Sequence, residues 1–128
     1  VSDLISPGTM LVVDDDEALR SRLAQAFVDR GWRCCAAADA DEARRLTATE
    51  SPTHAVLDLS MPGDSGLVLL RDLRAANPDI QVVMLTGYGS IATAVDAIKA
   101  GAVNMIQKPA DVDMVMAAFT RPGGDPEA

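Results

Sequence analysis

Short apolar runs alternate along this chain with longer segments in which apolar residues recur at helical spacing. Runs of this length, bounded by turn residues, are typical of buried strands. Right-handed crossovers between such strands produce an α/β fold, a doubly wound parallel sheet with helices on both faces. The predicted strands are 9–13, 32–37, 54–58, 81–86 and 104–107, and the predicted helices are about 17–30, 41–49, 66–77, 91–100 and 112–120.

Four of the five strands end on residues that are rarely placed beside an apolar run by chance. In parallel sheets a ligand site lies outside the carboxyl ends of the strands, so these side chains are expected in one crevice. Carboxylates, a hydroxyl and an ammonium can together hold a divalent cation and accept a phosphoryl group. The strand-end residues are Asp14, Asp15 and Asp16, then Asp58, then Thr86, and then Lys108 with Pro109.

The acidic residues favour a metal site. Adjacent carboxylates repel one another unless a cation lies among them, and Mg²⁺ takes a few carboxylate oxygens and keeps several waters. The predicted direct ligands are Asp15 and Asp58, with Asp14 holding a metal-bound water and the carbonyl of Ser60 completing the protein set. An isolated acidic triplet would more often be an ordinary polar loop. Its place after a buried strand, opposite a second strand-end carboxylate, favours Mg²⁺ or Mn²⁺.

Asp58 is the predicted nucleophile. A carboxylate can attack phosphorus and form an aspartyl phosphate, while a bound metal neutralises charge on the phosphoryl oxygens. Lys108 brings a flexible positive charge to the same oxygens. Thr86 offers a hydroxyl donor to a phosphoryl oxygen, and the neighbouring Gly87 leaves room for the incoming group.

Four segments of the chain resemble the receiver domain of two-component response regulators over residues 9–120. They read LVVDDDE, AVLDLSMPGDSG, VVMLTGYGSIATAVDAIKAGA and QKPAD. The resemblance implies a flavodoxin-like, CheY-like sheet with strand order 2-1-3-4-5. It implies that Asp58 is the phosphoacceptor, Asp14 and Asp15 the acidic pair, Thr86 the switch hydroxyl and Lys108 the phosphate-pairing lysine.

The same resemblance extends to finer features. It implies a cis peptide bond before Pro109. The segments TGYGSIATAV and KPAD are most similar to the RegA/PrrA/ActR branch, whose members are redox-responsive regulators with a C-terminal Fis-like helix-turn-helix. It also implies a sensor histidine kinase as partner, and an output face of helix 91–100, strand 104–107 and helix 112–120 that can form a homodimer.

One residue departs from the family pattern. The family usually has Tyr or Phe three residues before the lysine, as the rotating partner of Thr86, and this chain has Met105. Methionine fills an aromatic's space but has no hydroxyl and several accessible rotamers. Coupling through Met105 is therefore expected to be weak, and Tyr88 is a less favoured substitute.

Size and charge limit the other possibilities. The 128 residues suit one domain, read as a leader 1–8, a receiver 9–120 and a linker or tail 121–128. A net charge of −8 disfavours nucleic-acid binding by this chain, so DNA contact would need an output domain outside it. No apolar run approaches the ~20 residues of a membrane span, and no secretory signal is seen, so the expected location is the cytoplasm.

Three functions are compatible with these residues. The favoured one is a phosphorylation-controlled switch that catalyses only its own phosphorylation and dephosphorylation and controls transcription. A second is a stand-alone receiver that relays phosphate. A third is a Mg-dependent phosphohydrolase with an Asp nucleophile, disfavoured because Ser60 occupies the position of the general acid and there is no cap domain.

Several residues are expected to be structural. His54 is interpreted as a surface loop residue, and Cys34 and Cys35 as strand thiols that face opposite sides of the sheet. Helix 91–100 is expected to present an apolar stripe that contains Ile91 and Val95.

Overall fold

The computed structural model describes residues 7–61, 65–87 and 91–120. Five strands and five helices alternate along this part of the chain. The strands are β1 (Thr9–Val13), β2 (Arg33–Ala37), β3 (His54–Asp58), β4 (Gln81–Thr86) and β5 (Asn104–Gln107). The helices are α1 (Glu17–Asp29), α2 (Ala40–Glu50), α3 (Gly66–Ala76), α4 (Ile91–Lys99) and α5 (Val112–Thr120). All ten predicted elements are confirmed, with ends that differ by at most one residue.

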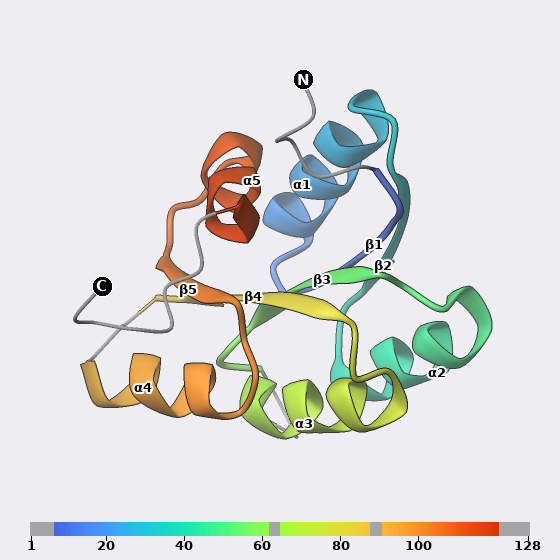
Figure 1. The fold of residues 1–128 in the computed structure, drawn as a ribbon. Coiled ribbons are helices and arrows are strands. Elements are labelled where there is room, and N and C mark those ends of the chain that lie inside the picture. The colour runs from blue at the N-terminus through green and yellow to red at the C-terminus, as the bar shows by residue number, and fades with distance from the viewer. Residues whose placement is uncertain (1–6, 62–64, 88–90, 121–128) are drawn as a thin grey trace.

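The strands form one parallel sheet in the order β2-β1-β3-β4-β5, as predicted. Helices α1 and α5 cover one face, and α2, α3 and α4 cover the other (Figure 1). The register aligns the strand ends, because Val13 lies opposite Leu57, Asp58 opposite Leu85, and Thr86 opposite Gln107. The polar residues that follow these strands therefore emerge at one edge of the sheet.

Two apolar cores lie on either side of the sheet. Leu23, Phe27 and Val115 pack beneath α1 and α5 on one face, and Leu70 and Leu73 of α3 pack on the other. Because the three central strands are covered on both faces, they are almost wholly apolar. The polar residues Asp58 and Thr86 at their carboxyl ends are nevertheless buried, which is unusual for such groups and marks this edge.

Side-chain caps fix where several helices begin. Asp16 caps α1, since its carboxylate accepts a hydrogen bond from the amide of Leu19 at 3.2 Å. Asp39 caps α2 in the same way, with the amide of Glu42 at 2.9 Å. Asp16 therefore has a structural role within the acidic triplet. Just after α1, Gly31 adopts a left-handed backbone conformation with φ of +93°, which glycine accepts without strain.

The expectation for His54 was wrong. This residue begins β3 and is half-buried, with its ring edge-on to Trp32 at 4.8 Å and to Phe119 at 5.2 Å between centroids. Its Nδ1 lies 2.8 Å from the hydroxyl of Thr53. Burial lowers the pKa of His54, because the charged ring would lose its hydration. A polar residue at the start of an apolar run was expected to face solvent, and only the packing of Trp32 and Phe119 shows that this ring is partly covered.

The expected stripe on α4 was also wrong in part. Ile91 is 86% exposed and Val95 is 38% exposed, and Ala97 is the buried residue of this helix. The prediction for the two cysteines is confirmed, since Cys34 packs toward the α1 side and Cys35 toward the α2 side. Thiols on opposite faces of a strand cannot form a vicinal disulfide without rebuilding the strand.

Residues in four stretches lie outside the described part of the chain. Most of the predicted leader, the predicted tail 121–128 and Tyr88 fall there. Among the described segments, every helix is too short or too polar to cross a bilayer.

Candidate functional site

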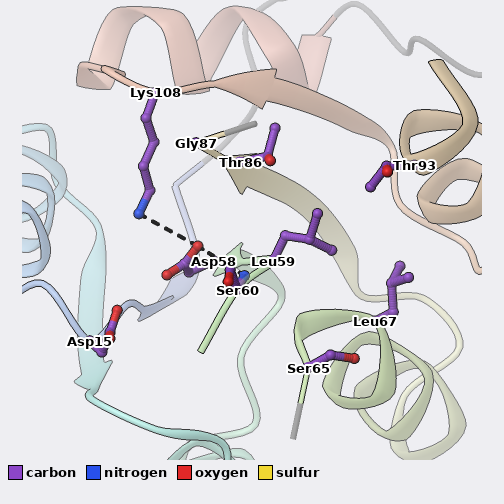
Figure 2. A pocket seen from close by; sticks show the side chains of 10 residues that line it. All are labelled: Asp15, Asp58, Leu59, Ser60, Ser65, Leu67, Thr86, Gly87, Thr93 and Lys108. Carbon is purple, nitrogen blue, oxygen red and sulfur yellow. Dashed lines mark hydrogen bonds and ion pairs between the residues drawn. The ribbon is translucent and has the colours of Figure 1, made fainter. Parts of the chain in front are cut away.

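A hollow of about 570 Å³ opens at the carboxyl edge of the sheet, where β1, β3, β4 and β5 end. Figure 2 shows Asp58 at its centre, with Asp15 on one side and the side chain of Lys108 reaching down from above. Thr86 lines it, together with Ser65, which is the N-cap of α3, and Thr93 from the first turn of α4. Sequence reasoning did not identify Ser65 or Thr93, although a serine just before an apolar helix is a recognisable cap signal.

The three predicted carboxylates lie together at this edge of the sheet, and Asp15 and Asp58 line the hollow. Asp14 is fully buried, Asp58 is 3% exposed and Asp15 is exposed. One oxygen from each lies within 4.8 Å of the others. Three carboxylate oxygens at this separation, one open to solvent, suit a hard divalent cation that keeps part of its water shell. The residues present therefore fit a Mg²⁺-type ion, with Asp15 on the accessible side.

Lys108 joins the two buried carboxylates. Its Nζ lies 2.9 Å from Oδ2 of Asp14 and 3.5 Å from Oδ1 of Asp58. Burial alone would lower the pKa of Lys108, but the ion pair with Asp14 and the charge of Asp58 raise it above its ordinary value. The ammonium therefore remains charged at neutral pH. The peptide bond between Lys108 and Pro109 is cis, as predicted.

Asp58 is held in an unfavourable ionised state. Its pKa is raised from 3.8 to about 6, mainly by burial, then by the negative charge of Asp14 and to a smaller extent by that of Asp15. The amide of Ser60, which donates to Oδ1 at 3.2 Å, and the charge of Lys108 act in the opposite direction. A carboxylate with this environment gains from any cation or covalent change that removes its charge.

Thr86 is tied to the lysine through the backbone. It is 4% exposed, and its carbonyl accepts a hydrogen bond from the amide of Lys108 at 2.8 Å. The amide of Leu59 donates to the carbonyl of Leu85 at 2.8 Å, which fixes β3 against β4 just beyond Asp58. The predicted hydroxyl, nucleophile and ammonium are therefore carried on strand ends that are hydrogen-bonded to one another.

Met105 lies away from the hollow, on the α4 side of β5. It is partly buried against the core beneath α3 and α4, and in register with Met84 of β4. The structure thus places the pair Met84 and Met105 two residues back along the strands from the pair Thr86 and Gln107. A rearrangement of Thr86 would reach Met105 through neighbouring strands.

Residues 10–120 match the model of the response regulator receiver domain. The acid tolerance regulatory protein ActR of Rhizobium meliloti (strain 1021) is 44% identical over 124 residues, which cover 95% of this chain and 64% of ActR. The photosynthetic apparatus regulatory protein RegA of Rhodovulum sulfidophilum is 41% identical over 115 residues, or 90% of this chain and 63% of RegA. The chain thus spans somewhat less than two thirds of these relatives.

A solved structure supports the same assignment. A response regulator from Burkholderia pseudomallei, described with a phosphorylated aspartic acid, a calcium ion and citrate, superposes with a TM-score of 0.83. It is 41% identical, and the match covers 88% of this chain and 66% of that one. The predicted similarity to the RegA/PrrA/ActR branch is confirmed by ActR and RegA among the relatives. Together with the sheet order and the acidic crevice, these matches establish that the chain belongs to the response regulator receiver domain family.

Proposed function

We propose that Asp58 accepts a phosphoryl group from a sensor histidine kinase in a Mg²⁺-dependent reaction, and that this change switches an output. The observation that carries the proposal is the position of Lys108, whose ammonium bridges the buried Asp14 and Asp58. Asp58 thus lies beside both the Lys108 ammonium and the carboxylates of Asp14 and Asp15, and it lines the open hollow.

The transfer follows from these side chains. An oxygen of Asp58 attacks phosphorus, the bond from phosphorus to the kinase's imidazole nitrogen breaks, and that nitrogen keeps the electron pair. Lys108 lies where it can pair with the phosphoryl oxygens, and Thr86 can donate its hydroxyl to one of them. Asp14, Asp15, Asp58 and the carbonyl of Ser60 would hold the cation, which supplies charge neutralisation on those oxygens.

The proposed output is regulatory. ActR and RegA are named as regulatory proteins and are longer than this chain, so we propose that the switch controls transcription through a C-terminal DNA-binding domain outside it. The net charge of −8 supports placing the DNA contact elsewhere. The exposed Ile91 and Val95 on α4 and Met114 on α5 support a homodimer face built from α4, β5 and α5.

The acceptor is tested by intact-mass measurement after incubation with Mg²⁺ and acetyl phosphate. The parent should gain one phosphoryl group and the Asp58→Asn variant none. Asp79→Asn, at an exposed carboxylate between α3 and β4, is the matched control and should be labelled like the parent. Equal labelling of Asp58→Asn would show that another group is the acceptor.

The metal is tested with the Asp15→Asn variant. Mg²⁺ should raise the melting temperature of the parent by mass action, and this rise should disappear in the variant. The variant without metal should be at least as stable as the parent without metal, because part of the carboxylate repulsion is removed. A rise of equal size in the variant would place the ion elsewhere.

A further inference from the structure

Arg20 contacts the acidic loop from the first turns of α1. Its guanidinium Nη1 donates to the backbone carbonyl of Asp14 at 2.9 Å, a partly buried contact across six residues. Its own amide donates to the carbonyl of Asp16 at 2.9 Å, so α1 has already begun where the side chain turns back. Arg20 was not among the residues predicted for the site, because an arginine on an amphipathic helix normally faces solvent.

Asp14 is held at each of its polar atoms. Its amide donates to the carbonyl of Ala37 at 3.2 Å, and its Oδ1 accepts from the amide of Asp16 at 2.9 Å. Its Oδ2 faces the ammonium of Lys108 at 2.9 Å. The fourth atom, the carbonyl oxygen, takes the hydrogen bond from Arg20. Because Asp14 is fully buried, these four contacts determine where its carboxylate and the next residue, Asp15, lie.

We infer that Arg20 is a positioning residue for the metal site, holding the loop that carries Asp14 and Asp15. A hydrogen bond from a charged donor is stronger than one between neutral groups. Groups that orient metal ligands commonly change metal affinity by 10- to 100-fold when they are removed. The inference rests on the metal site proposed above and adds a residue that does not itself touch the ion.

The direction in which Mg²⁺ affinity changes when Arg20 is replaced distinguishes a positioning role from a purely electrostatic one. Removing a positive charge near three carboxylates should, by Coulomb attraction alone, leave Mg²⁺ binding unchanged or make it tighter. Loss of positioning should make it weaker. Arg22 provides the matched control, because it lies on the same helix, is exposed, and its replacement changes the net charge equally.

The experiment measures the Mg²⁺ dissociation constant by calorimetric titration of the parent, Arg20→Met and Arg22→Met, without any phosphodonor. Arg20→Met should bind Mg²⁺ about tenfold more weakly than the parent, and Arg22→Met as tightly or slightly more tightly. Binding by Arg20→Met that equals that of Arg22→Met would overturn the inference. If circular dichroism shows Arg20→Met to be unfolded, Arg20→Gln replaces it under the same criterion, since Gln is a good helix former and too short to reach the carbonyl.

Failure of the underlying metal site would look different. A parent without a Mg²⁺ response, or an Asp15→Asn variant that binds as the parent does, would refute the proposed metal site itself. A parent that responds, with Asp15→Asn inert and Arg20→Met unaffected, would refute only the role of Arg20.

Discussion

Strand β3 has a titratable residue at each end, Asp58 buried and His54 half-buried, and the surroundings of these two residues differ. At the carboxyl end, Asp58 lies among Asp14, Asp15 and Lys108 beside an open hollow. At the amino end, His54 lies edge-on to two aromatic rings. Burial disfavours the charged form at both ends, so it raises the pKa of Asp58 and lowers that of His54.

The difference between His54 and Asp58 shows when a buried titratable group becomes reactive. The ring of His54 avoids the desolvation cost of a charge by remaining neutral. It packs against Trp32 and Phe119, which are not reactive groups. Asp58 is kept near a second buried carboxylate, which no packing can relieve. Lys108, at 3.5 Å, offsets this charge only in part. A further cation, a proton or a covalent bond would relieve the rest, and this makes that end of the strand reactive.

The largest loss of stability is expected from adding a side chain at Gly66, where α3 packs against the carboxyl end of β3. A Cβ added at Gly66 would lie 2.3 Å from the carbonyl oxygen of Asp58 and 2.8 Å from Cα of Leu59. Both are backbone atoms, so α3 or β3 would have to move. Gly66→Ala should lower the free energy of unfolding by more than about 3 kcal/mol, measured by urea denaturation.

Gly87→Ala is the control for this prediction. A Cβ there would meet no atom of the described residues within 4 Å, so stability should change by less than about 1 kcal/mol. Equal losses in the two variants would show that the approach of α3 to β3 is not the constraint.

The next effect concerns the charge of Asp58. Because its folded pKa of about 6 lies above the ordinary 3.8, the folded state binds more protons between these values and loses stability as pH rises through about 6. Asp58→Asn removes this loss and should stabilise the metal-free protein by about 2 kcal/mol at pH 7, with less gain at pH 4. Urea denaturation in a chelator at both pH values measures it.

Asp79→Asn again serves as the control, since this exposed carboxylate should alter stability little at either pH. A metal-free Asp58→Asn variant less stable than the parent at pH 7 would contradict the idea that this end of β3 stores an unfavourable charge.

A smaller effect is expected at Met105, which we expect to couple phosphorylation at Asp58 to the face of α4, β5 and α5. Met105 has no hydroxyl and several rotamers, so it should report weakly on the phosphorylated state. Met105→Tyr should strengthen the coupling between a beryllium fluoride adduct and dimerisation by roughly fivefold, measured by sedimentation. A parent that already responds as strongly as the variant would show that position 105 is not the weak link.

The smallest effect belongs to the opposite end of β3. Because burial lowers the pKa of His54, the unfolded chain binds its proton first as pH falls through 6.5. Stability should therefore decline on acidification, opposite in sign to the contribution of Asp58. The two windows overlap, so the slope is measured in the Asp58→Asn background, where His54→Gln should flatten it. His54 is the chain's one histidine, and an unchanged slope would mean that other groups produce it.

The sequence by itself determined the elements of this protein and the chemistry of its reactive edge. Short continuous apolar runs alternate with segments in which apolar residues recur at helical spacing. This pattern was enough to predict five strands and five helices, because a strand covered on both faces is apolar throughout. The residues at the strand ends then had to meet, since parallel strands end together. Asp14, Asp58, Thr86 and Lys108 are for this reason visible in the sequence.

Only the tertiary structure decided contacts that depend on how elements far apart in the sequence pack. It covered His54 with a ring of α5, left Ile91 and Val95 exposed on α4, and brought the guanidinium of Arg20 back to the carbonyl of Asp14. Periodicity shows which residues share a helical face, but the angle at which that helix lies on the sheet decides which of them are buried. A long side chain such as that of Arg20 can point in several directions, and the local sequence pattern does not predict which direction it takes.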